Sequence, residues 1–153
     1  MSEDRDLPQD EPEELEEPLL RERDESLCPC KSRLPYSQCC RDFHHGKKKC
    51  ETAEQLMRSR YSAYFFRLPG YLFDTQHPDS RPAGLKKSLE KTLWSYNWAN
   101  LKVLGTVRGE KGDNRGKVEF EATCFIQGEE HHLHEVSRFK RHKSVWKYLD
   151  DKG

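Results

Sequence analysis

The chain has 153 residues, with 27 basic and 27 acidic side chains and a formal net charge of zero at pH 7. This length suits one ordinary domain with its own core plus a small accessory element, and it excludes two full domains. No segment approaches eighteen consecutive apolar residues, so the sequence predicts no membrane-spanning helix.

The charge is unevenly distributed along the chain. Residues 1–26 hold twelve acidic and three basic side chains, a net charge of −9, whereas residues 27–153 hold 24 basic and 15 acidic side chains, a net charge of +9. The first segment also has three prolines and a single adjacent apolar pair, Leu19-Leu20. Such a composition buries too little apolar surface to offset the entropy of ordering, so we expect residues 1–26 to be a disordered acidic tail.

The first segment also bears on the cellular compartment. It lacks the basic start and apolar stretch of a secretory signal, and it is too acidic for an organelle transit peptide. We therefore expect a cytoplasmic protein, with the nucleus as the alternative. In those reducing compartments, clustered cysteines more often hold a metal than form disulfides.

Four cysteines form two close pairs, Cys28-Pro29-Cys30 and Cys39-Cys40, with eight residues between the pairs. Two thiol pairs joined by a tight loop provide the ligands that one tetrahedral zinc ion needs. Because the protein would fill all four coordination positions, the sequence predicts one structural Zn²⁺ ion and no catalytic metal.

Other roles for these and nearby residues stay open. The cysteines could be free thiols or oxidised pairs in a flexible segment, and His44 or His45 could replace one thiol as a ligand. We expect Cys50 and Cys124 to be unrelated to the metal, because Cys124 lies on an apolar strand face and suits a small core position.

Helical patterns follow a basic connector at residues 47–49. Thr52 and Gln55 form a capping box, and no proline or glycine interrupts residues 53–68, so a long helix is predicted there. Residues 71–78 are predicted to form a short helical turn that a proline ends. Apolar residues at helical spacing predict a third helix over residues 84–97.

Beyond Trp98 the apolar period changes to two. This alternation predicts four antiparallel strands over residues 101–107, 118–126, 131–140 and 145–149. Three helices followed by these strands indicate an α+β domain in which the helices cover one face of a curved sheet.

Polar side chains are expected inside this domain. If the face of the third strand that carries Glu135 turns toward the helices, the carboxylate is buried and needs a partner. Arg60 lies within the apolar stripe of the first long helix, so we expect an ion pair between Arg60 and Glu135. Such residues either fix how helix and sheet pack or line a pocket. The candidate pocket residues are Arg58, Arg60, Tyr64, His77, Glu135, Ser137 and Tyr148.

Basic runs occur at residues 47–49 and 138–143. They suit phosphate contacts, so binding to nucleic acid is a minor hypothesis. They are equally consistent with solvated surface that the acidic tail neutralises.

The cysteine segment resembles the SEC-C zinc motif, whose pattern is Cys-Pro-Cys-Gly-Ser-Gly followed by Tyr and a final Cys-Cys or Cys-His. Residues 28–40 read CPCKSRLPYSQCC, so Lys31 and Arg33 replace the two motif glycines. If those positions require positive φ, the loop is strained or differently shaped.

The rest of the chain resembles the YchJ family. The matching stretches are TAEQLMRSRYSAY from residue 52, TQHP from residue 75, HEVSRF from residue 134 and WKYLD from residue 146. Gln76 stands where the family usually has tryptophan. The resemblance implies a nuclear transport factor two-like cone over residues 51–151, preceded by a SEC-C zinc knuckle over residues 27–46.

That fold hosts isomerases and dehydratases as well as binding modules, so it does not choose a function. In the SecA motor a similar zinc motif docks a chaperone and ribosomes. By this analogy we expect a non-catalytic binding or adaptor module for a protein or ribosomal partner, with no catalytic residue assigned. The alternative is a small-molecule-binding protein or enzyme that uses the cone interior, with His77 and Glu135 as acid–base groups and Arg58 or Arg60 as anion anchors.

Overall fold

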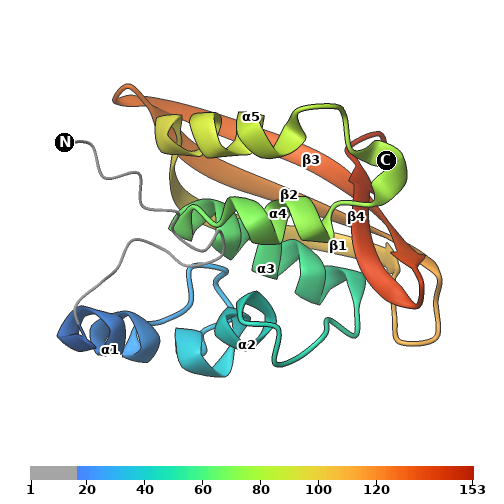
Figure 1. Cartoon of the computed structure of the whole chain (residues 1–153), viewed down its shortest axis with the longest axis horizontal. Helices are drawn as coiled ribbons and strands as arrows, with labels where there is room; N and C mark the ends of the chain where they lie inside the picture. The colour runs from blue at the N-terminus through green and yellow to red at the C-terminus, as the bar shows by residue number, and fades with distance from the viewer. Residues whose placement is uncertain (1–16) are drawn as a thin grey trace.

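The structure, a computed structural model, describes residues 17–153 (Figure 1). None of the helices in this part of the chain is both long enough and apolar enough to cross a membrane. The helices are α1 (Glu17–Glu25), α2 (Cys40–His44), α3 (Ala53–Phe66), α4 (Pro69–Thr75) and α5 (Leu85–Thr92), and the strands are β1 (Asn97–Arg108), β2 (Arg115–Ile126), β3 (Glu129–His142) and β4 (Val145–Asp150).

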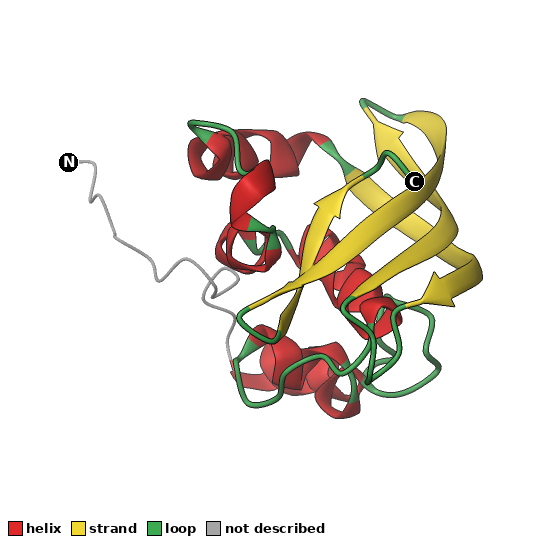
Figure 2. Ribbon diagram, turned by 90° about the vertical axis from the view of Figure 1, so that its right-hand side faces the viewer, coloured by secondary structure: helices red, strands yellow, loops and turns green. Residues whose placement is uncertain are grey.

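The four strands form one antiparallel sheet in the order β1-β2-β3-β4. Figure 2 shows this sheet curving on one side of the molecule, with the helices on the other. The predicted α+β class, with α3, α4 and α5 preceding four antiparallel strands, is confirmed. On the inner face of the sheet, Phe120 of β2 lies opposite Glu135 of β3 and Val103 of β1.

The capping box predicted for the long helix is present. The Thr52 hydroxyl accepts a hydrogen bond from the backbone N–H of Gln55 (3.1 Å), and the Gln55 side chain accepts one from the backbone N–H of Glu51 (2.7 Å). The helix ends at Phe66, two residues before the predicted end, because Arg67 takes the left-handed conformation (φ 58°) and Pro69 starts α4.

Two glycines let the β1–β2 hairpin approach the start of α3. The backbone N–H of Ala53 donates to the carbonyl of Gly109 (2.9 Å), which has φ +80°. A Cβ atom on Gly116 would lie 2.4 Å from the Cα of Gly109, so a side chain there would push the hairpin away from the helix. Gly116 therefore allows the sheet and α3 to pack at this end.

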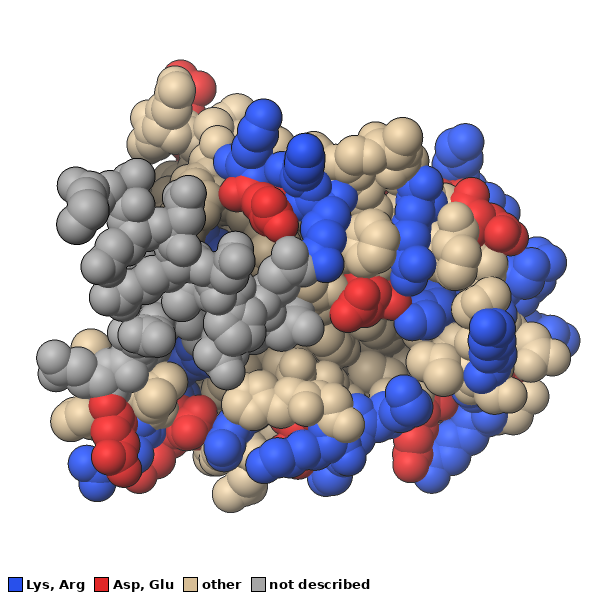
Figure 3. Space-filling model, in the orientation of Figure 1, with Lys and Arg blue, Asp and Glu red and all other residues tan. Residues whose placement is uncertain are grey.

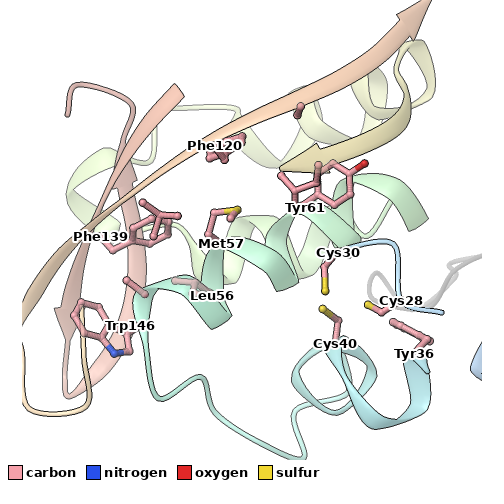
Figure 4. Packing of buried hydrophobic residues seen from close by; sticks show 14 residues of the cluster. Cys28, Cys30, Tyr36, Cys40, Leu56, Met57, Tyr61, Phe120, Phe139 and Trp146 are labelled. Carbon is pink, nitrogen blue, oxygen red and sulfur yellow. The ribbon is translucent and has the colours of Figure 1, made fainter. Parts of the chain in front are cut away.

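The main core lies between α3 and the inner face of the sheet (Figure 4). Leu56 and Met57 of α3 pack in one buried cluster with Phe139 of β3 and Trp146 of β4. Cys28, Cys30 and Cys40 belong to the same cluster, so the cysteine segment joins the domain core. Cys124 is buried on β2, as expected for a core residue.

Some predicted boundaries were wrong. Residues 17–25 form α1, although disorder was expected over residues 1–26; residues 1–16 lie outside the described part. The helix has no buried residue, but the Arg23 guanidinium stacks over the rings of Phe66 (4.3 Å) and Tyr36 (5.0 Å). These cation–π contacts attach α1 to the domain without an apolar face.

The third helix also ends earlier than predicted. It stops at Thr92, and a single 3₁₀ turn (Leu93–Ser95) leads directly into β1. The strand therefore begins at Asn97, inside the segment that had been assigned to the helix.

Candidate metal centre and interior pocket

The structure brings the four predicted metal-ligating cysteines together. Their sulfur atoms all lie within 4.8 Å of one another, and Figure 4 shows the sulfurs of Cys28, Cys30 and Cys40 gathered beneath α3. The Cys39 sulfur lies 3.6 Å from that of Cys30 and 3.8 Å from that of Cys40. A tetrahedral ion with sulfur ligands at about 2.3 Å sets sulfur–sulfur distances of about 3.8 Å. The cluster could therefore hold one metal ion.

The loop between the two cysteine pairs keeps the conformation that glycines would favour. Lys31 has φ 66° and Arg33 has φ 71°, both in the left-handed region. The backbone N–H of Cys28 donates to the carbonyl of Leu34 (2.8 Å), which closes the loop. The two residues that replace the motif glycines therefore both take a strained conformation.

Residues of α3 support the cysteine cluster from the domain side. The Ser62 hydroxyl donates to the sulfur of Cys40 (3.3 Å) and lies 3.4 Å from that of Cys28. Arg58 donates from Nη1 to the carbonyl oxygen of Cys30 (2.6 Å) and from Nε to Glu54 (2.9 Å). The sequence reasoning missed Ser62 and placed Arg58 in the pocket. The spacing of four residues, which puts both on one helix face, was the available signal.

Hydrogen bonds between the thiols shift their pKa values in opposite directions. The pKa of Cys30 is lowered because Cys28 and, with a smaller effect, Cys39 hydrogen-bond to its sulfur. Hydrogen bonding to the Cys39 sulfur, with the bond from Cys28 having the largest effect, lowers the pKa of Cys39 to about 7. The pKa values of Cys28 and Cys40 are raised by hydrogen bonding within the cluster, with burial adding to the effect. A divalent cation would take the place of these shared protons, because thiolates are the ligands.

His44 binds protein groups through both ring nitrogens. The Tyr36 hydroxyl donates to Nδ1 (2.6 Å), and Nε2–H donates to the carbonyl of Ser59 on α3 (2.8 Å). Burial lowers the pKa of His44 to about 4, which favours the neutral ring that this arrangement needs. His44 is therefore a link between α2 and α3, and the idea that it replaces a thiol ligand is wrong.

A cavity of about 320 Å³ lies between the helices and the inner face of the sheet. Leu89, Leu93 and Trp98 contribute to its apolar wall. Five of the seven candidate pocket residues line it, namely Arg60, Tyr64, Glu135, Ser137 and Tyr148.

The other two candidates lie elsewhere. Arg58 contacts the cysteine segment through the carbonyl oxygen of Cys30. His77 is 3% exposed, and its Nδ1 accepts a hydrogen bond from the backbone N–H of Asp79 (3.1 Å). Its own backbone N–H donates to the carbonyl of Tyr148 (2.7 Å), so His77 caps a 3₁₀ turn and fixes it to β4.

The predicted ion pair between Arg60 and Glu135 is wrong, since none forms between them within residues 17–153. Arg60 donates from Nη1 to the carbonyl of Leu72 (2.8 Å) and to the hydroxyl of Thr75 (2.7 Å), and its guanidinium stacks on the Tyr148 ring (4.5 Å). Two acceptors on α4 and the Tyr148 ring therefore take the place of a carboxylate partner for the guanidinium.

Glu135 takes its hydrogen bond from a residue on its own strand. The Ser137 hydroxyl donates to the carboxylate, while burial raises the pKa of Glu135. Both side chains face the cavity, so the predicted inward face of β3 is confirmed.

The basic runs lie on the surface among acidic residues. Figure 3 shows lysine and arginine side chains over much of one face, with aspartate and glutamate between them. Arg138 pairs with Asp150 (2.5 Å), and Lys48 lies 3.6 Å from Asp42. Partial neutralisation of this kind favours the interpretation of the runs as solvated surface.

Comparison with known proteins identifies the family to which the chain belongs. A family model described as "YchJ, middle NTF2-like domain" matches residues 52–151. A UPF0225 protein of Geobacter sulfurreducens is 36% identical over 128 residues, which cover 84% of this chain and 80% of that protein. A UPF0225 protein of Streptomyces coelicolor is 40% identical over 123 residues, which cover 80% of this chain and 92% of that protein.

Two solved structures share the fold. The solution structure of a SEC-C motif containing protein from Rhodopseudomonas palustris has a TM-score of 0.71 and 29% identity, covering 82% of this chain and 96% of that chain. The crystal structure of a SEC-C motif containing protein from Psychrobacter arcticus has a TM-score of 0.70 and 27% identity, covering 85% of this chain and 84% of that chain. The chain therefore belongs to the YchJ family of UPF0225 proteins, and it carries a four-cysteine cluster ahead of its NTF2-like domain.

Proposed function

We propose that this chain is a non-catalytic binding protein whose four cysteines hold one structural Zn²⁺ ion and whose knuckle, residues 27–46, contacts a protein partner. The closed cysteine cluster is the observation that carries the proposal. All four sulfurs come from the chain, and three of the four cysteines are buried, so a bound ion has no free position for a substrate.

Zinc fits this donor set better than other common ions. Four thiolates at tetrahedral spacing suit zinc or iron–sulfur chemistry and are poor ligands for magnesium or calcium. The sulfurs lie close enough for a single ion, which favours zinc. A cytoplasmic location, proposed from the sequence, would keep the thiols reduced and available.

The outer side of the knuckle has the character of a contact surface. Leu27 is 68% exposed and Leu34 is 45% exposed, and Lys31 and Arg33 are exposed beside them. Exposed leucines flanked by cations suit a partner surface that combines apolar and acidic side chains. We therefore propose an acidic protein surface as the partner, with ribosomal proteins included in the search.

Paired variants test the partner proposal. Leu27→Asp with Leu34→Asp changes the knuckle surface, whereas Leu104→Asp with Val107→Asp changes two exposed apolar residues on β1 and serves as the matched control. Both proteins are checked for bound zinc by native mass spectrometry and then used to capture cross-linked partners from cells of the source organism.

We expect a defined set of proteins to be captured by the wild type and the control and to be lost with the knuckle variant, with capture unaffected by ribonuclease. Capture of the same proteins by both variants would contradict the proposal. Loss of the captured set after ribonuclease would indicate an RNA partner instead.

A further inference from the structure

The interior cavity has the size and walls of a binding site for a small molecule. Its volume of about 320 Å³ is at the lower end of the range for ligand pockets. Aromatic rings form one side: Trp98 stacks with Tyr96 (ring centroids 6.3 Å apart, planes at 22°), and Tyr64 lies 5.9 Å from Trp98. These walls favour a planar ring, because ring faces and edges stack favourably on aromatic side chains.

A buried donor in this wall has no acceptor. The indole N–H of Trp98 is shielded from solvent and makes no hydrogen bond to any residue of the described chain. Buried donors are almost always paired, so an unpaired one at a cavity needs an explanation. A ligand that carries an acceptor would satisfy it.

Glu135 is the opposite case, an acceptor that lacks further donors. Its carboxylate faces the cavity and accepts one hydrogen bond, from Ser137, although a carboxylate can accept several. The remaining acceptor capacity suits a ligand that carries a hydroxyl or N–H group. Two residues that line the cavity, Trp98 and Glu135, thus carry an unused donor and an unused acceptor.

The charges of the cavity favour an uncharged ligand. Arg60 is 6% exposed and lines the same cavity as Glu135. Because the cavity is lined by one charge of each sign, a charged ligand is attracted by one group and repelled by the other, and it would lose its own hydration on entry. A neutral molecule avoids both penalties.

We propose that the cavity binds a small uncharged aromatic molecule that donates a hydrogen bond to Glu135 and accepts one from the indole N–H of Trp98. This site is separate from the cysteine cluster and does not depend on the adaptor role proposed above. It gives the NTF2-like domain a ligand class of its own.

Nuclear magnetic resonance of the full, metal-loaded chain tests this proposal. The chain has three tryptophans, so the indole N–H of Trp98 can be assigned with a Trp98→Phe variant. The first probe is 4-hydroxyacetophenone, which has a hydroxyl donor at one end and a carbonyl acceptor at the other. 4-Methoxyacetophenone lacks the donor, and 4-hydroxybenzoate adds a negative charge.

We expect 4-hydroxyacetophenone to shift the Trp98 indole resonance with saturation, and the methoxy and benzoate probes to bind about tenfold more weakly or worse, since the site would lose a hydrogen bond or repel the charge. Glu135→Leu should weaken binding of the hydroxyl probe by a similar factor. Glu130→Leu, an exposed position on the same strand, is the matched control and should leave binding unchanged.

Three results would overturn the proposal: no shift of the Trp98 indole up to the solubility limit of the probe, equal affinity for the hydroxyl and methoxy probes, or unchanged affinity in Glu135→Leu. If Glu135→Leu fails to fold, the comparison of the three probes on the wild-type chain still decides. Zinc content measured on the same samples keeps a failure of this site distinct from a failure of the metal site.

Discussion

The guanidinium of Arg58 on α3 donates a 2.6 Å hydrogen bond to the carbonyl oxygen of Cys30, 28 residues earlier in the chain. Ser62, one turn further along the same helix, donates to the sulfur of Cys40. One face of α3 therefore holds the cysteine segment, while other positions on the helix face the sheet. This arrangement makes the cysteine knuckle and the NTF2-like domain a single packed unit.

Removing the Arg58 donor should loosen the knuckle. Arg58→Met keeps an unbranched side chain of similar length but leaves the Cys30 carbonyl without its charged donor. This change should lower the free energy of unfolding by about 1–3 kcal/mol. We expect faster transfer of the bound metal to a competing chelator, measured by absorbance of the chelator complex.

The matched control for Arg58 is Glu54→Gln, which changes only the half-exposed ion pair of the same guanidinium. Exposed pairs contribute about 0–1 kcal/mol, so metal release from this variant should stay close to that of the wild type. Equal release rates for Arg58→Met and the wild type would show that the bond to Cys30 is unimportant for the knuckle.

The Ser62 hydroxyl should strengthen the metal site through its bond to sulfur. Ser62→Ala leaves the ligands in place but removes a donor that stabilises thiolate, and losses of this kind reduce metal affinity by about 10–100-fold. Competition titration with a zinc chelator measures the change. Ser59→Ala, a buried serine on the same helix that bonds to Leu56 and Tyr71, should reduce stability without a comparable loss of zinc affinity.

Glycine at the two strained loop positions should stabilise the protein. Lys31→Gly and Arg33→Gly each relieve a left-handed conformation, for a gain of about 1 kcal/mol per site. The expected result is a higher Tm for the metal-loaded protein, additive for the pair. Lys31→Ala keeps the unfavourable conformation and should give no such increase. If the glycine variants melt below the wild type, the two side chains stabilise the loop in a way that outweighs the strain.

His44 should make stability depend on pH in the mildly acidic range. Its pKa falls from 6.5 to about 4 on folding, because burial disfavours the charged ring. Between these values the unfolded chain binds a proton that the folded chain does not, so the free energy of unfolding falls as pH decreases from 6.5 to 4. The contribution is complete above pH 6.5 and amounts to about 3 kcal/mol.

Denaturant unfolding at several pH values between 7.5 and 5 checks this prediction. In His44→Gln the slope of stability against pH should decrease, whereas release of metal by acid affects both proteins alike. An unchanged slope in the variant would mean that His44 does not titrate as its burial implies.

Local patterns were sufficient to predict most of the fold. The capping box at Thr52 identified the start of α3, and the strict alternation from Val118 to Ile126 identified β2, because both signals depend on neighbouring residues alone. The spacing of the cysteines likewise predicted which sulfurs lie together.

Contacts between distant segments could not be predicted in this way. Whether Arg60 turns toward Glu135 or toward the carbonyl of Leu72 depends on how α4 packs, and no local sequence pattern predicts that packing. Arg58, two residues earlier on the same helix, was predicted to line the pocket but lies on another face, against the knuckle. The contacts of α1 were missed for a related reason, since Arg23 binds aromatic rings that come from two later segments.

The central claim is that the four cysteine sulfurs hold one zinc ion, and its most direct test is metal analysis of freshly purified, reduced protein. Native and denaturing mass spectrometry together should show one zinc per chain, which is absent from a Cys39→Ser, Cys40→Ser variant. Reduced protein that is folded but carries no stoichiometric metal would contradict the account.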